Sequence, residues 1–88
     1  MKHKKDFLLQ KVSTTYVVVA VNEAAISFKR MITFNETGAF LWEALDNDCT
    51  EEQLVKALTD EYDVCEAIAS RDVGIFVERL RAAGLIDD

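Results

Sequence analysis

The spacing of apolar residues changes once along this 88-residue chain, across residues 31–38. Before this stretch, apolar and β-branched residues come in short runs at residues 7–12 and 16–21, which is typical of strands. After it, apolar residues recur every three or four positions, which is typical of amphipathic helices. We therefore expect a strand to end at Phe34 and a helix to begin after Asn35, whose side chain can cap it.

The chain after Asn35 contains three helical segments. The first covers residues 36–46. The second begins at a capping box, in which Thr50 and Gln53 can each accept a hydrogen bond from the other's backbone N–H. The third covers residues 66–83, and Gly84 after it is typical of a left-handed helix end.

The segments before Asn35 predict three strands. Residues 22–25 are expected to form a turn, and residues 26–30 fit either a loop or the start of the third strand. The order strand, strand, strand, helix, helix, helix predicts the α+β class. We expect a winged-helix-like domain, with a three-stranded antiparallel sheet followed by three helices.

Length and charge restrict the function. The chain is long enough for one domain, here residues 7–88, and residues 1–6 are predicted to be a disordered basic tail. Its 16 acidic and 10 basic residues give a net charge of -6, which argues against nucleic acid as a partner. Cys49 and Cys65 lack metal-ligand spacing, and no run approaches ~18 apolar residues. We expect a cytoplasmic protein that contacts neither a metal nor a membrane.

No catalytic motif is present in the sequence. It has no Gly-rich phosphate loop, no HExxH, no CxxC, and no Ser or Cys with a suitable His partner. The acidic residues of the second helix are interpreted as solvated charge. We therefore expect a binding protein without a catalytic residue or a cofactor.

The third helix carries two rows of side chains. Ala69, Val73, Phe76, Val77 and Leu80 form one apolar stripe and are predicted to be core. Beside it runs a mixed apolar and charged row of Ile68, Asp72, Ile75 and Arg79. Two interpretations of this row remain open: a partly exposed helix face, or one wall of a peptide groove.

The order and spacing of these segments resemble the PqqD-like family over about residues 7–86. The matching segments are residues 7–12, 16–19, 32–45, 50–55, 61–64 and 72–85. The resemblance implies a recognition domain, or peptide chaperone, for ribosomally made peptides that are modified after translation. Many relatives serve pathways other than pyrroloquinoline quinone synthesis, so the fold does not fix the pathway.

The resemblance also implies a binding mode and partners. In the family, the leader segment of a precursor peptide adds as a strand to the edge of the third strand and packs on the third helix. A modifying enzyme, often of the radical S-adenosylmethionine type, then acts on the presented peptide. Carried over by position, the peptide-binding residues are Arg30, Met31, Ile32, Thr33, Phe34, Ile68, Asp72, Ile75, Phe76 and Arg79.

Two alternatives remain beside leader binding. One is a winged-helix DNA-binding or regulatory domain, although the third helix carries only Arg71, Arg79 and Arg81 as basic residues. Another is a structural subunit that docks on an enzyme. An exposed strand edge can also pair with a second copy of itself, which would give a homodimer.

Overall fold

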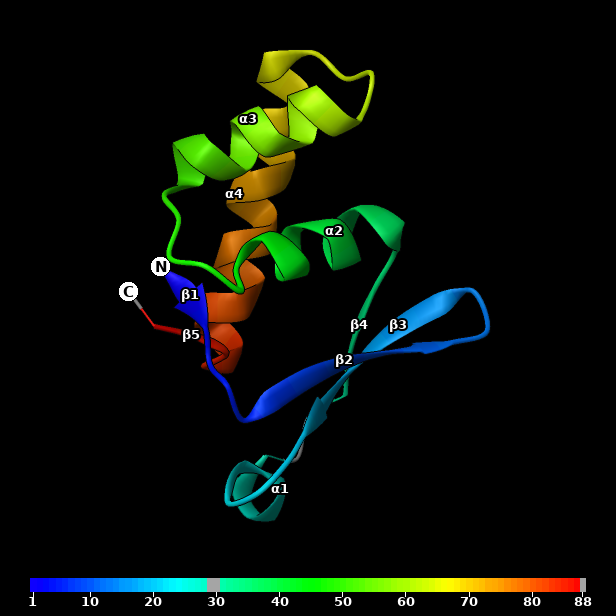
Figure 1. The fold of residues 1–88 in the computed structure, drawn as a ribbon, viewed down its shortest axis with the longest axis vertical. Helices are drawn as coiled ribbons and strands as arrows, with labels where there is room; N and C mark the ends of the chain where they lie inside the picture. Colours follow the sequence, from blue (N-terminus) through cyan, green and yellow to red (C-terminus); the bar gives the residue numbers. More distant parts are fainter. Residues whose placement is uncertain (29–30, 88) are drawn as a thin grey trace.

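The structure, a computed structural model, describes residues 1–28 and 31–87. Its elements in chain order are β1 (Lys2–His3), β2 (Phe7–Val12), β3 (Thr15–Ala20), α1 (Ala24–Ser27), β4 (Ile32–Phe34), α2 (Glu36–Ala44), α3 (Glu51–Glu61), α4 (Glu66–Ala83) and β5 (Ile86–Asp87). Within the described residues, β2, β3 and β4 form a three-stranded antiparallel sheet, followed along the chain by α2, α3 and α4 (Figure 1). The predicted α+β class is confirmed.

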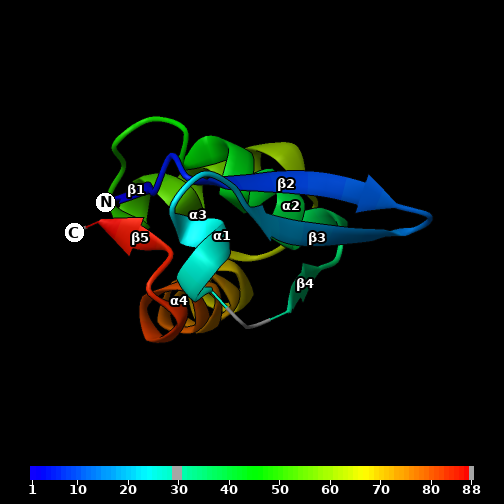
Figure 2. The same ribbon diagram turned by 90° about the horizontal axis from the view of Figure 1, so that it is seen from below.

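The sheet has β3 in its centre, so β2 and β4 form its two edges. Ser13 and Thr14 make the loop between β2 and β3, and Ser13 adopts a left-handed φ of 60°. Helix α2 packs on β3 and β4. Seen from below, β4 is the strand that lies on the side of α4 (Figure 2).

The connection between β3 and β4 differs from the expectation. Asn22 takes a left-handed φ of 56° in the turn, as a turn residue can, but the chain then forms one helical turn, α1. The Phe28 N–H ends this helix by donating to the Ala24 carbonyl at 2.9 Å. The Phe28 ring packs edge-on against Phe7 at 5.0 Å. This contact joins the end of α1 to β2. It lies between residues far apart in the sequence, so local sequence patterns do not predict it.

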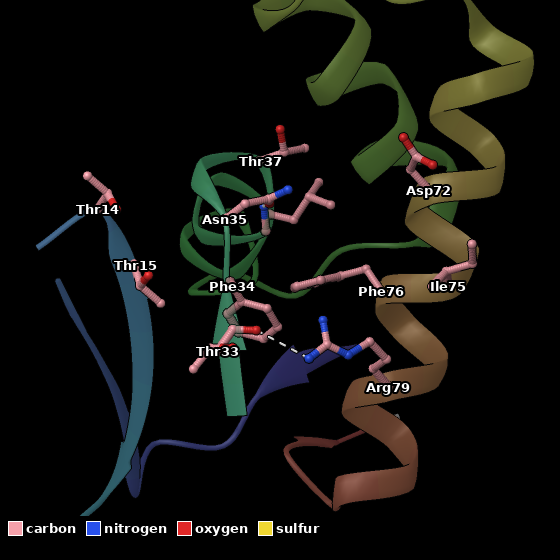
Figure 3. Close-up of a pocket in the computed structure, with 12 residues that line it drawn as sticks. Thr14, Thr15, Thr33, Phe34, Asn35, Thr37, Asp72, Ile75, Phe76 and Arg79 are labelled. Carbon is pink, nitrogen blue, oxygen red and sulfur yellow. Dashed lines mark hydrogen bonds between the residues drawn. The ribbon is translucent and has the colours of Figure 1, made fainter. Parts of the chain in front are cut away.

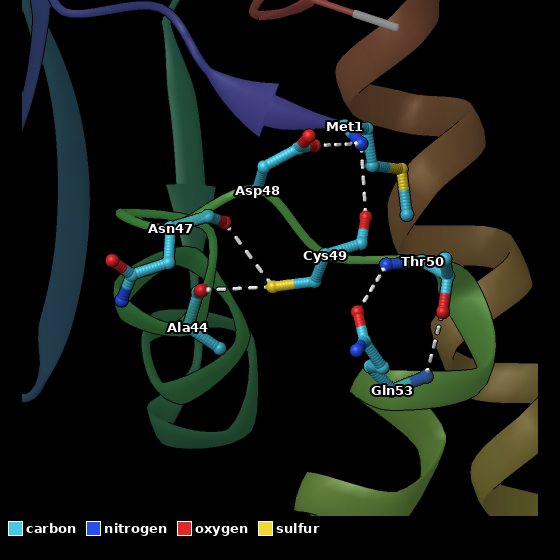
Figure 4. Close-up of polar contacts among 7 residues, drawn as sticks. All are labelled: Met1, Ala44, Asn47, Asp48, Cys49, Thr50 and Gln53. Carbon is cyan, nitrogen blue, oxygen red and sulfur yellow. Dashed lines mark hydrogen bonds and ion pairs between the residues drawn. The ribbon is translucent and has the colours of Figure 1, made fainter.

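The capping signals predicted at the starts of α2 and α3 and at the end of α4 are present in the structure. Thr50 and Gln53 form the capping box, with N···O distances of 2.9 and 3.1 Å (Figure 4). The Gly38 N–H donates to Asn35 Oδ1 at 2.9 Å, which caps α2. Gly84 ends α4 with a left-handed φ of 72°. Helix α2 ends at Ala44 rather than at residue 46.

The core lies between the sheet and the helices. The predicted stripe of α4 is buried, and Val73, Val77 and Leu80 are completely inaccessible. Trp42 is also fully packed, because the His3 ring stacks on it at 4.5 Å with the two planes nearly parallel. The core therefore joins the N-terminal residues to α2.

Residues 1–6, predicted to form a basic tail, contain a strand in the structure. Strand β1 pairs antiparallel with β5. The Met1 ammonium group lies 2.6 Å from an Asp48 carboxylate oxygen, and this contact lowers the pKa of Asp48 (Figure 4). The charge pattern of the N-terminal residues carries no signal for these contacts, since the partners of Met1 and His3 lie more than forty residues away in the sequence.

Candidate functional site

The outer edge of β4 presents backbone groups that β3 does not use. Alternate residues of an antiparallel strand turn their N–H and C=O groups to opposite sides. The two residues that close the hairpin loop bond to each other, and this decides which residues of β3 turn toward β2. Val12 and Thr15 close this loop, so Thr15 and Val17 turn toward β2.

Tyr16 and Val18 therefore turn the other way, toward their partners Phe34 and Ile32 in β4. Thr33, which lies between these partners, must turn its N–H and C=O away from β3. The hydrogen bonds of the structure agree with this deduction, because the Thr33 carbonyl accepts from Arg79 of α4.

A groove separates this edge of β4 from α4 (Figure 3). Its volume is about 550 Å³. Residues from the β2–β3 hairpin, β4, the N-terminal half of α2 and one face of α4 line it. They are Thr14, Thr15, Thr33, Phe34, Asn35, Thr37, Gly38, Leu41, Asp72, Ile75, Phe76 and Arg79.

Packed aromatic rings form the floor of the groove. The Phe34 and Phe76 centroids are 5.2 Å apart, and both side chains are buried. Gly38 lets α2 approach this floor closely, since a Cβ at this position would lie 2.8 Å from the Phe34 Cβ. The position of β4 relative to the helices is therefore fixed by tight packing.

The wall contributed by α4 is more exposed and carries both charges of the groove. The Ile75 side chain is 56% exposed. Asp72 lies toward the start of α4, with its carboxylate 3.4 Å from Arg71. Arg79 reaches across to β4, where Nη2 donates to the Thr33 oxygen at 3.2 Å and the guanidinium lies 5.3 Å from the Phe34 centroid.

The structure brings together six of the predicted site residues, which line the groove: Thr33, Phe34, Asp72, Ile75, Phe76 and Arg79. Three others lie apart from it. Ile32 is buried under the sheet, while Met31 and Ile68 are exposed without lining the groove. Arg30 lies outside the described residues. Peptide binding by these residues remains a prediction.

The predicted site residues did not include the threonines of the hairpin and of α2 that line the groove. Thr15 reaches the groove because Tyr16 pairs with Phe34, which places the hairpin loop beyond the end of β4. Thr37 reaches it from the first turn of α2. Strand register was the missing signal, because it decides which loop lies beside the edge.

The groove suits binding of an extended chain. It offers an outer strand edge, apolar surface from Phe34, Ile75 and Phe76, and a charge of each sign. In the part of the chain that the structure describes, no cluster of three or more His, Cys, Asp or Glu could hold a metal ion. Among those same residues no helix has the length and hydropathy to cross a membrane.

We compared the sequence and the fold with those of known proteins. The family model of coenzyme PQQ synthesis protein D (PqqD) matches residues 15–86. No curated protein matches the sequence. The fold is similar to that of a solved structure described as TbiB1 in complex with the TbiA(beta) leader peptide, with a TM-score of 0.74, 20% identity and full coverage of both chains.

Proposed function

The chain belongs to the PqqD family, and from this premise we propose that it binds the leader segment of a ribosomally made precursor peptide. The leader adds as a further strand to the outer edge of β4 and packs on α4. The protein presents the peptide and catalyses no step itself. Because the precursor comes from the ribosome, binding takes place in the cytoplasm.

One observation carries the proposal: Thr33 turns its backbone N–H and C=O toward an open groove. A peptide strand at this edge can exchange a pair of backbone hydrogen bonds with Thr33, whatever its own sequence. Each such bond contributes only about 0.5–1.5 kcal/mol net, so side-chain contacts with the groove have to supply the rest. Ile75 provides an exposed apolar surface for them.

The solved structure of similar fold supports a leader peptide as the ligand, since its description names a complex with one. A DNA-binding role gains no support from the open face of α4. This face carries Ile68, Asp72 and Ile75 together with Arg79, and a net charge of -6 repels phosphates.

The proposed partners beyond the leader are a modifying enzyme and a second copy of this chain. An enzyme of the radical S-adenosylmethionine type would act on the peptide while the groove holds its leader. The outer edge of β2, which faces no other strand among the described residues, is a second edge at which two copies can pair.

A titration tests the function. Leaders of precursor peptides encoded beside this gene are added to isotope-labelled protein, and amide resonances are followed. We expect binding with a dissociation constant of about one micromolar or less, with shifts at Thr33, Phe34 and Ile75. Shifts confined to β2, or no shift with any of these leaders, would overturn the proposal.

A further inference from the structure

Arg79 occupies the place at which an added strand would bond. Its Nη2 donates to the Thr33 oxygen from the open side of β4 at 3.2 Å. The backbone N–H of an added strand approaches the same oxygen from the same side, to an N···O distance of about 2.9 Å. Strand addition therefore displaces the guanidinium from Thr33.

The displaced guanidinium needs a new acceptor, and the groove offers few. Among the described lining residues, the only carboxylate belongs to Asp72. Asp72 lies seven residues before Arg79, or about 10 Å along the helix, and its carboxylate already contacts Arg71. A guanidinium covered by peptide without an acceptor would be costly, because its donors would lose water and gain nothing.

A carboxylate on the peptide removes this cost. Arg binds carboxylates through two parallel hydrogen bonds, which are stronger than bonds between neutral groups. Among the described residues that line the groove, Arg79 is the only basic one. An acidic peptide side chain thus has one preferred place in it.

The geometry of α4 fixes where this acidic residue lies in the peptide. Peptide residues opposite Ile32 and Phe34 share the side of the sheet that faces the helix. Ile75 and Arg79 are four residues apart, or about 6 Å along α4. Two strand residues on one face are about 6.7 Å apart. The two spacings match.

We propose that Arg79 is a specificity-determining residue of this groove. It releases the Thr33 carbonyl to the peptide and binds a carboxylate two positions away from an apolar residue that packs on Ile75. The inference rests on the proposed function and narrows its substrate class: the leader carries an apolar and an acidic residue on its helix-facing side, separated by one intervening residue.

Selection from a random-peptide display library tests this requirement without knowledge of the natural leader. The full chain, Arg79→Glu and Lys56→Glu each serve as bait. Lys56 is exposed on α3, so its reversal changes the net charge equally but leaves the groove intact.

We expect the full chain and Lys56→Glu to enrich Asp or Glu two positions from an apolar residue. Arg79→Glu should enrich Lys or Arg at that position instead. An unchanged acidic preference with Arg79→Glu would overturn the inference, and so would groove-binding peptides that show no acidic preference.

An affinity measurement completes the test. Changing the selected acidic residue to its amide should weaken binding to the full chain about tenfold, and less at high salt. With Arg79→Gln, the two peptides should bind alike. If the acidic and amide peptides bind the full chain equally while shifting Thr33 and Ile75, the inference fails and the proposed function stands. If the selected peptides bind without shifting either residue, the proposed function fails with it.

Discussion

Two faces of α4 differ sharply although they belong to one helix. The face turned to the core carries Val73, Val77 and Leu80, which are fully buried. The face turned to β4 carries Asp72, Ile75 and Arg79, which line an open groove. The first face stabilises the fold by packing in the core. The second face leaves side-chain surface exposed that no other part of the described chain covers fully.

The difference shows how a small domain can combine rigidity with an open binding edge. The close approach of Gly38 to Phe34 fixes β4 against α2, and the buried contact between Phe34 and Phe76 holds β4 against α4. The groove face can then remain partly exposed without loss of structure. A change on either face should therefore affect one property and spare the other.

The largest expected effect is on the core face. Leu80→Ala removes a fully buried side chain and should lower the free energy of unfolding by about 2–5 kcal/mol. Ile75→Ala on the groove face is the matched control and should cost less than about 1 kcal/mol, because its side chain is more than half exposed. Urea denaturation measures both. Equal losses would mean that the two faces do not differ as described.

The next effect concerns the contact that positions the groove. Gly38→Ala places a Cβ 2.8 Å from the Phe34 Cβ, so α2 and β4 must move apart. We expect a loss of about 1–3 kcal/mol in urea denaturation, as for an overpacked core. Gly74→Ala is the control, since a Cβ there meets no neighbour within 4 Å. An unaltered stability for Gly38→Ala would show that this approach is not constrained.

A smaller effect on stability is expected from a charge on the groove wall. Ile75→Glu should change the free energy of unfolding by no more than about 0.5 kcal/mol, because the side chain is more than half exposed at the rim of the groove. Binding of the leader should nevertheless be lost, since a carboxylate replaces the apolar contact. Denaturation and peptide titration on the same sample separate the two outcomes. A variant that fails to fold would place Ile75 in the core.

The smallest expected effect is a pH dependence of the stability, which arises at Tyr62, outside the groove. Burial, followed by Glu36 and Glu61, raises the pKa of Tyr62, whose ring packs edge-on against Phe40 at 5.5 Å. The neutral phenol is thus favoured in the folded state, so its contribution is complete below the unfolded pKa of about 10 and is lost as the pH rises above it.

Tyrosinate absorbance in the Tyr16→Phe background isolates this group, since the chain has 2 tyrosines. We expect ionisation of Tyr62 at higher pH in the folded protein than in urea. Stability above pH ~10 should fall less steeply for Tyr62→Phe. Identical titrations in the folded and unfolded states would contradict the burial of this ring.

The features that could be predicted from the sequence are those with local signals. The helix starts at Asn35 and Thr50 and the helix end at Gly84 follow from capping chemistry, and the two rows of α4 follow from helical periodicity. The contact between His3 and Trp42 has no such signal, because it depends on tertiary packing across the domain.

The candidate site divides in the same way. The row containing Asp72, Ile75 and Arg79 could be read from the spacing of residues along one helix. The bond from Arg79 to the Thr33 carbonyl could not, because it joins residues 46 positions apart and depends on strand register. Ile68 and Met31 show the limit of the pattern: each has a suitable position in the sequence, yet neither lines the groove.

The most direct test of the account is hydrogen exchange at the Thr33 amide, with and without bound leader. This N–H turns to the open edge of β4, so a peptide strand that adds there should protect it strongly. Val18, whose N–H turns to β4 in both states, provides the internal reference. The account predicts slow exchange at Thr33 only in the complex. Saturating binding that leaves the exchange rate of Thr33 unchanged would contradict strand addition at this edge.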